Sequence, residues 1–169
     1  MIRIALTGPE SSGKTTFAEL LANKLGCSYV PEYARTYLSN LNRDYQQEDL
    51  DDILKGQLKE WNDLSNEPIA IYDTEILVLK IWSEFKYGNC SKLILDELSK
   101  QQIDFYLLCA PDIPYEEDEL RENPNDRHIL FDLYLENLKR MNVNYQIIEG
   151  DREKLLNEIA IKIKEKTYS

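Results

Sequence analysis

Residues 8–15 constrain the fold of this chain more than any other part of its sequence. They read Gly-Pro-Glu-Ser-Ser-Gly-Lys-Thr and match the pattern G-x-x-x-x-G-K-[ST]. An apolar run at residues 2–6 precedes them and predicts a buried strand, while apolar side chains at helical spacing predict a helix over residues 14–25. A strand, a glycine-containing loop and a helix in this order are typical of α/β folds that bind an anion at the helix start.

The residues of this loop suit the phosphates of a nucleoside triphosphate. Glycines allow the backbone to curl so that its N–H groups point inward, and the start of the helix adds partial positive charge. Lys14 brings a full charge to the β- and γ-phosphates, and Thr15 offers a hydroxyl to Mg²⁺. We therefore expect ATP and Mg²⁺ to bind here. The loop residues expected to contact ATP are Gly8, Glu10, Ser11, Ser12, Gly13, Lys14, Thr15 and Thr16.

Short apolar runs alternate with amphipathic stretches along the rest of the chain. This alternation predicts an α/β fold of the P-loop kinase-like class, a five-stranded parallel sheet with helices on both faces. Asn123 and Pro124 predict the cap and first position of one helix, and Trp61 and Trp82 fall on apolar helical stripes and are expected in the core. The strands are expected at residues 2–6, 28–31, 69–72, 103–109 and 145–148, and the helices at 14–25, 32–38, 49–64, 75–85, 91–100, 124–141 and 151–166.

Length and charge limit the classes of protein to which the chain can belong. Its 169 residues show no linker, so we expect a single domain over residues 1–169. With 31 acidic and 20 basic residues the net charge is −11, which repels nucleic acid and anionic lipid, so neither is expected as a partner. The apolar runs are short, the three cysteines form no disulfide pattern, and the N-terminus leads straight into residues 2–6. We therefore expect a cytoplasmic protein.

Charged residues follow the second and third expected strands, at the edge of the sheet where ligands of parallel sheets bind. Asp73 ends a buried strand and is expected to hold Mg²⁺, with a helix cap as the alternative. The second strand is expected near the first, which would bring Glu32 and Arg35 to the acceptor side of the site. Glu32 could accept the proton of an attacking hydroxyl or bind a ribose diol, and either Asp73 or Glu32 would orient that hydroxyl. The alternative is that Glu32 and Arg35 form an exposed ion pair, which contributes little to stability and has no role at the site.

Residues 111–127 hold several prolines and many acids and predict a mobile lid. Arg121 is expected to meet the charge of the transferred phosphoryl group, and a closed lid excludes water. Arg127 is expected at ATP, with a salt bridge as the alternative, and Tyr115 is expected to stack on a flat ring of the acceptor. Asp151 follows the last strand and is expected beside the nucleotide base, with capping of the last helix as the alternative.

Four stretches together resemble the kinase domain of the NadR family. They are residues 8–15, Pro31-Glu32-Tyr33-Ala34-Arg35, Tyr72-Asp73-Thr74-Glu75 and residues 112–121, which end in Leu-Arg. That family phosphorylates nicotinamide riboside with ATP to give nicotinamide mononucleotide, and the resemblance covers nearly the whole chain. Tyr115 stands where the family often has Trp. The resemblance implies that Lys14 and Thr15 bind ATP and Mg²⁺, that Asp73 lies near the metal and the acceptor hydroxyl, that Glu32 and Arg35 line the acceptor side, and that Arg121 belongs to the lid.

The sequence therefore predicts an ATP-dependent kinase for the 5′-hydroxyl of a riboside, with nicotinamide riboside as the acceptor that the resemblance implies. The catalytic residues expected are Lys14, Asp73, Glu32 and Arg121, and the residues expected at the acceptor are Glu32, Arg35, Asp73 and Tyr115. Two alternatives are open at this point. One is a P-loop ATPase or GTPase switch without a small acceptor, and the other is a kinase for another nucleoside or metabolite.

Overall fold

The computed structural model describes residues 1–63 and 66–167, and within them five strands form one parallel sheet. The strands are β1 (Ile2–Thr7), β2 (Tyr29–Val30), β3 (Ile69–Asp73), β4 (Phe105–Cys109) and β5 (Tyr145–Ile148). Their order across the sheet is β2-β3-β1-β4-β5, and every neighbouring pair is parallel. The predicted fold class is confirmed.

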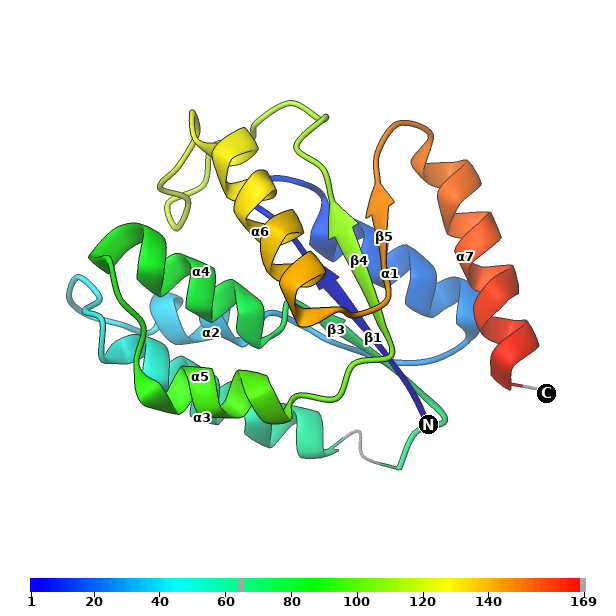
Figure 1. The fold of residues 1–169 in the computed structure, drawn as a ribbon, viewed down its shortest axis with the longest axis horizontal. Helices are drawn as coiled ribbons and strands as arrows, with labels where there is room; N and C mark the ends of the chain where they lie inside the picture. Colours follow the sequence, from blue (N-terminus) through cyan, green and yellow to red (C-terminus); the bar gives the residue numbers. More distant parts are fainter. Residues whose placement is uncertain (64–65, 168–169) are drawn as a thin grey trace.

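Helices cover both faces of the sheet (Figure 1). α1 and α7 pack against one face, whereas α4 and α6 cover the other and α2, α3 and α5 pack outside α4. Successive side chains of β1 enter opposite cores: Ile4 lies beneath α1 and α7, and Ala5 beneath α4 and α6. The helices are α1 (Lys14–Leu25), α2 (Tyr33–Ser39), α3 (Asp49–Asp63), α4 (Ile76–Tyr87), α5 (Lys92–Lys100), α6 (Arg127–Met141) and α7 (Arg152–Thr167).

The ends of several elements differ from the expected bounds by one or two residues, and two features differ further. β2 pairs with β3, which separates it from β1. The helix expected over 49–64 is observed over Asp49–Asp63, and its last expected residue, 64, lies outside the described residues. The helix expected from Pro124 begins only at Arg127, and residues 124–125 form a turn in which the backbone N–H of Asp126 donates to the carbonyl oxygen of Asn123 at 3.3 Å.

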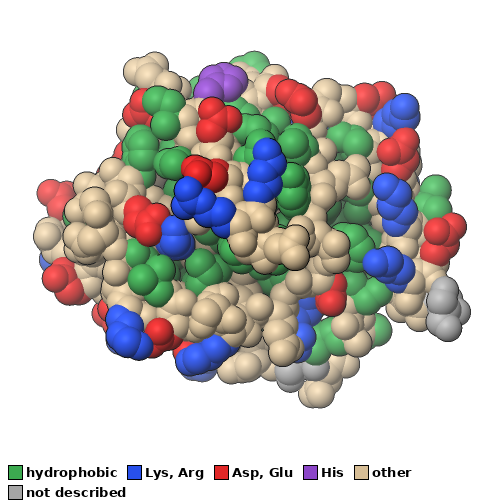
Figure 2. All heavy atoms as spheres, viewed as in Figure 1, with side chains coloured by type: hydrophobic (Ala, Val, Ile, Leu, Met, Phe, Trp, Pro, Cys, Tyr) green, Lys and Arg blue, Asp and Glu red, His purple; other side chains and the backbone are tan. Residues whose placement is uncertain are grey.

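The strands end at one edge of the sheet, where residues 111–127 cross from β4 to α6 (Figure 1). On the face seen in Figure 2, Lys and Arg side chains lie among Asp and Glu side chains rather than in one continuous basic surface. Among the described residues, no helix is both long and apolar enough to cross a membrane. In parallel α/β sheets, ligands bind at the edge where the strands end.

Candidate nucleotide and acceptor site

A pocket of about 540 Å³ lies at this edge of the sheet. The phosphate loop of residues 8–15 forms one side, and α2, α4, α6 and the 111–127 segment form the others. The pocket thus joins the loop that sequence analysis assigns to phosphates to a second compartment lined by helices. A volume of this size is in the range of pockets that bind small organic molecules.

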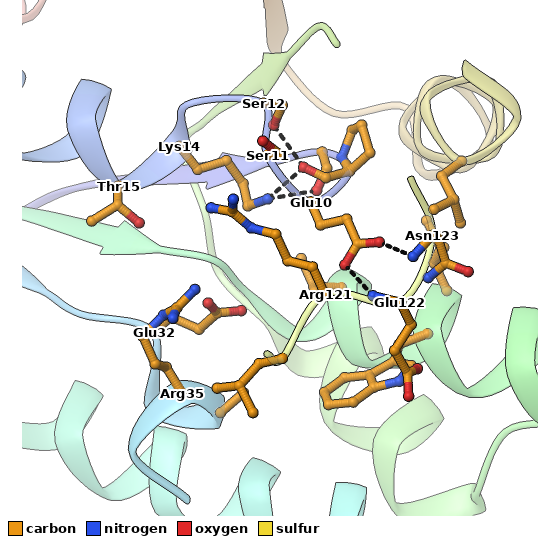
Figure 3. Close-up of a pocket in the computed structure, with 18 of the residues that line it drawn as sticks. Glu10, Ser11, Ser12, Lys14, Thr15, Glu32, Arg35, Arg121, Glu122 and Asn123 are labelled. Atoms are coloured by element: carbon orange, nitrogen blue, oxygen red, sulfur yellow. Dashed lines mark hydrogen bonds between the residues drawn. The ribbon is translucent and has the colours of Figure 1, made fainter. Parts of the chain in front are cut away.

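The shape of the phosphate loop depends on two of its glycines. Gly8 has φ 127°, and a Cβ atom there would lie 2.6 Å from the carbonyl oxygen of Cys109 in β4. Gly13 has φ 80°, a conformation that side chains rarely adopt, and it directly precedes α1. Lys14 Nζ donates to the carbonyl oxygens of Gly8 and Pro9, at 2.9 and 2.7 Å, so its charge lies against the loop (Figure 3).

Thr15 and Asp73 are joined by a side-chain hydrogen bond at the edge where the strands end. The Thr15 hydroxyl donates to Asp73 Oδ2 at 2.6 Å, and Asp73 is only 3% exposed. Burial raises the pKa of Asp73, and the hydrogen bond from Thr15 partly opposes that rise. Asp73 Oδ1 is buried and accepts no hydrogen bond from the described residues. A cation would satisfy this oxygen, and a carboxylate beside a hydroxyl suits Mg²⁺, which takes oxygen ligands from one or two side chains and completes its shell with water and phosphate.

Glu32 and Arg35 line the helical compartment of the pocket. Glu32 occupies the N-cap position of α2, but its side chain makes no cap hydrogen bond and lies in the pocket instead (Figure 3). Burial raises the pKa of Glu32, while the charge of Lys14 acts in the opposite direction. Arg35 forms its ion pair with Asp118 of the 111–127 segment, at 2.8 Å, rather than with Glu32. The exposed Glu32–Arg35 pair considered from the sequence is therefore absent among the described contacts.

The 111–127 segment lies over the phosphate loop. The Glu10 carboxylate accepts hydrogen bonds from the backbone N–H groups of Glu122 and Asn123, and Ser11 Oγ accepts one from Glu116 N at 2.9 Å. Arg121 lines the pocket and extends from this segment toward the phosphate loop (Figure 3). An arginine at this place can meet charge that develops on a phosphoryl group bound by the loop.

Trp82 has a place at the site that its apolar stripe did not predict. It packs against the core of α2, α3, α4 and α5 as expected, but it is only partly buried and also lines the helical compartment together with Leu38 and Phe85. The indole N–H donates to Tyr45 Oη at 3.0 Å, and the two rings meet edge to face with centroids 5.1 Å apart. The sequence did not reveal that Trp82 lines a pocket, because the apolar residues of a pocket wall and of a core face recur with the same helical spacing.

The Tyr45 hydroxyl is the centre of a polar cluster at this end of the pocket. It donates to Glu122 at 2.6 Å and accepts from Lys86, and Lys86 is also ion-paired with Glu122 at 2.9 Å. Burial and the hydrogen bond to Glu122 raise the pKa of Tyr45 to about 12, so this hydroxyl stays protonated at neutral pH. The cluster joins the loop before α3 and helix α4 to the 111–127 segment.

Four residues expected at the ligands are not among those that line the pocket: Asp73, described above, and Tyr115, Arg127 and Asp151. The Tyr115 ring lies 5.5 Å from the guanidinium carbon of Arg127, and Arg127 donates to the carbonyl oxygens of Ser11 and Ile113. Asp151 accepts a 3.0 Å hydrogen bond from Lys154 N and so caps α7, the alternative left open by the sequence. Hydrogen bonds to nearby backbone groups occupy Arg127 and Asp151, and the Tyr115 ring lies against Arg127.

Arg152 was not among the residues expected at the site, but it binds the backbone of the phosphate loop. Its guanidinium donates to the carbonyl oxygens of Ser12 and Ala110, at 2.8 and 3.0 Å, and to Asp112 at 2.6 Å. Asp112 also accepts the backbone N–H of Gly150 at 2.6 Å. The only signal in the sequence was the position of Arg152 after the last strand, next to Asp151.

Comparison with known proteins places this geometry in a family. The model of the AAA domain family (AAA_28) matches residues 3–154. The chain belongs to this family. Among curated proteins, this AAA domain chain is 27% identical over 150 residues to the trifunctional NAD biosynthesis/regulator protein NadR of Salmonella typhimurium, and 40% identical over 73 residues to cytidylate kinase of Streptococcus uberis.

These alignments cover 84% and 41% of the AAA domain chain but only 37% and 29% of NadR and cytidylate kinase, so the chain spans about a third of the relatives it matches. The crystal structure of NadR protein in complex with NR superposes with a TM-score of 0.74 at 22% identity, covering 89% of this chain and 44% of that one. The chain therefore has the P-loop fold of nucleoside and nucleotide kinases, and the resemblance to NadR is confirmed.

Proposed function

We propose that this protein is an ATP-dependent kinase that transfers the γ-phosphoryl group to the 5′-hydroxyl of nicotinamide riboside. The observation that carries the proposal is one pocket that is lined by the phosphate loop, by Glu32 and by Trp82 together. A switch protein needs a phosphate loop but no compartment for a second small molecule. The similarity to NadR over 84% of the chain supports the same acceptor.

The phosphate loop and Lys14 would bind the triphosphate, and Thr15 with Asp73 would hold Mg²⁺. When bound, the metal ion neutralises charge on the phosphate oxygens. The riboside oxygen attacks the γ-phosphorus, the bond from phosphorus to the β,γ-bridging oxygen breaks, and ADP leaves. Glu32 takes the hydroxyl proton in this scheme, because it lines the pocket whereas Asp73 is buried and already bonded to Thr15.

Residues 111–127 would act as the lid of this site. Their contacts with the phosphate loop cover the place where the γ-phosphate would bind, and Arg121 points into it. Excluding water favours transfer to the riboside over hydrolysis of ATP. The lid is also the element through which the site would exchange its ligands.

The helical compartment supports an acceptor without a phosphate of its own. The basic side chains that α2 and α4 bring to it, Arg35 and Lys86, are both paired with carboxylates, Asp118 and Glu122, at 2.8 and 2.9 Å. A nucleoside monophosphate needs cations free for its phosphate. The apolar surface of Trp82 and its neighbours instead suits a flat ring attached to a neutral ribose. These features favour a riboside over the cytidine monophosphate type of acceptor.

The direct test is incubation of the purified protein with ATP, Mg²⁺ and nicotinamide riboside, with chromatographic detection of nicotinamide mononucleotide and ADP. Cytidine, cytidine monophosphate and deoxyadenosine serve as competing acceptors, and Lys14→Ala serves as the inactive control. We expect equal amounts of mononucleotide and ADP from nicotinamide riboside and less product from the other acceptors. ATP hydrolysis that no acceptor changes would overturn the proposal.

A further inference from the structure

Glu10 is an acidic residue in a loop whose other groups suit an anion. Its two carboxylate oxygens accept the backbone N–H groups of two successive residues of the 111–127 segment, with a 3.0 Å contact to Glu122 and a shorter one to Asn123 (Figure 3). The partners lie 112 and 113 residues away in the sequence. A bidentate contact of a carboxylate with two backbone donors fixes the orientation of the bound segment as well as its distance.

Arg121 directly precedes the two residues that Glu10 binds, and the chain before Arg121 is held by a second set of contacts. Asp118 is paired with Arg35 of α2 at 2.8 Å, and the backbone N–H of Arg121 donates to the carbonyl oxygen of Asp118 at 3.0 Å. The Arg121 guanidinium donates to the carbonyl oxygen of Glu116. The backbone on both sides of Arg121 is therefore held in place. Arg35 of α2 holds it through Asp118, and Glu10 of the phosphate loop holds it through the residues that follow Arg121.

We propose that Glu10 is a positioning residue that holds the 111–127 segment over the phosphate loop and thereby places Arg121 for phosphoryl transfer. The part of this inference that concerns transfer rests on the proposed function. Glu10 does not touch the reacting atoms in this scheme. It acts through the backbone of Glu122 and Asn123 on the side chain next to them.

Electrostatics links this contact to the bound nucleotide. With the segment lifted away, the negative charge of Glu10 faces the phosphates in the same loop and opposes their binding. With the segment closed, two N–H donors offset that charge. Closure and triphosphate binding then favour each other, since each lowers the free-energy cost of the other. A neutral residue at position 10 would lose this coupling.

The test compares Glu10→Ala and Glu10→Gln with the native protein, and Glu119→Gln, which changes an exposed carboxylate of the same segment, is the matched control. The first readout is the rate of trypsin cleavage after Arg121 with Mg²⁺ and a non-hydrolysable ATP analogue present. The second is the ratio of riboside phosphorylation to riboside-independent ATP hydrolysis. Thermal melting of each variant reports on folding.

For Glu10→Ala we expect about tenfold faster cleavage and an about tenfold lower transfer-to-hydrolysis ratio, as the loss of charge-assisted hydrogen bonds implies. Glu10→Gln keeps one acceptor oxygen, so its cleavage rate and its transfer-to-hydrolysis ratio should lie between those of Glu10→Ala and those of the native protein. Glu119→Gln should match the native protein in both. Native cleavage rates and ratios in both Glu10 variants would overturn the inference, and if Glu10→Ala does not fold, Glu10→Gln decides. A native protein that phosphorylates no riboside contradicts the proposed function alone, because the cleavage readout needs no acceptor.

Discussion

The hydroxyl of Thr15 and the carboxylate of Asp73 are joined by a 2.6 Å hydrogen bond that links the first turn of α1 to the end of β3. The two residues are 58 positions apart in the sequence, and the pairing of β1 with β3 brings them together. The second oxygen of Asp73 is buried without a donor among the described residues. This pair is where a divalent cation would lie between the chain and the phosphates.

Replacement of Asp73 tests that assignment. Asp73→Asn keeps the shape and an acceptor for Thr15 but removes the charge, so we expect the Mg²⁺ concentration for half-maximal activity to rise about tenfold or more. The measurement is a Mg²⁺ titration of ADP formation. Asp132→Asn, an exposed change on α6, is the control and should leave the titration unchanged. The same Mg²⁺ requirement in Asp73→Asn as in the native protein would remove Asp73 from the metal site.

Replacement of Glu32 tests the acceptor side. Glu32→Gln should lower kcat for riboside phosphorylation by about 10²-fold or more because it removes the proton acceptor, while ATP binding changes little. Glu32→Asp should recover part of the rate. Steady-state kinetics with riboside and calorimetry with ATP separate the two effects. Loss of ATP binding in Glu32→Gln would argue that the residue belongs to the nucleotide side.

The pH profile extends this prediction. Burial raises the pKa of Glu32 and of Asp73, so both carboxylates take up a proton at a higher pH than exposed ones do. Because the deprotonated forms are required, kcat/KM for the riboside should fall as pH decreases, and the fall should begin above the ordinary carboxyl pKa of about 4.3. A profile that stays flat down to pH 4 would contradict the assigned roles.

Gly56 allows close packing of α3 against α2. A Cβ atom at this position would lie 2.0 Å from Tyr33 Cε1, so Gly56→Ala must displace the ring, and we expect a loss of about 1–3 kcal/mol in the free energy of unfolding. Urea denaturation measures the loss. Lys59→Ala, an exposed change on the same helix, is the control. In a Tyr33→Ala background the substitution should be neutral or stabilising, and a stabilised Gly56→Ala single variant would contradict the packing.

Asp49 stabilises the start of α3. Its carboxylate accepts hydrogen bonds from Arg43 and Tyr37 and from the backbone N–H of Gln46, and Arg43 holds the pKa of Asp49 well below its usual range. A lowered folded-state pKa stabilises the protein above the unfolded value of about 3.9, and the contribution is lost as pH falls below it. Asp49→Asn should therefore lower the urea midpoint at pH 7, and its difference from the native protein should narrow toward pH 3.

The control for Asp49 lies on the same helix. Asp52 forms an exposed ion pair with Lys55, so Asp52→Asn should change stability by less than about 0.5 kcal/mol at any pH. A difference between Asp49→Asn and the native protein that does not depend on pH would show that the charge of Asp49 is not what stabilises the helix start.

Local signals predicted much of this fold. The spacing of apolar residues gave the bounds of the helix Lys14–Leu25 and of the strand Tyr145–Ile148 as observed, and Gly26 ends its helix with φ 68° as expected of a C-cap. The phosphate loop was predictable because all its determinants lie within eight residues. These features depend on neighbours in the chain, which is why a sequence pattern records them.

Long-range contacts account for what the sequence did not predict. Glu10 binds the backbone N–H of Asn123 from 113 residues away, and α6 starts at Arg127 despite a good local cap at Asn123. Arg152 reaches Ser12 across 140 residues. Trp82 packs against the core of α2, α3, α4 and α5 and also lines the pocket, because residues of the 111–127 segment complete that pocket. The spacing of apolar residues within one helix or strand does not record contacts with distant parts of the chain, so it could not predict these three.

Calorimetric titration with ATP and Mg²⁺ tests the central claim most directly, since every role assigned above requires a triphosphate on residues 8–15. We expect one nucleotide per chain for the native protein and for Lys24→Ala, an exposed change in α1, and at least about tenfold weaker binding for Lys14→Ala. A folded native protein that takes up neither ATP nor GTP in the presence of Mg²⁺ would contradict the account.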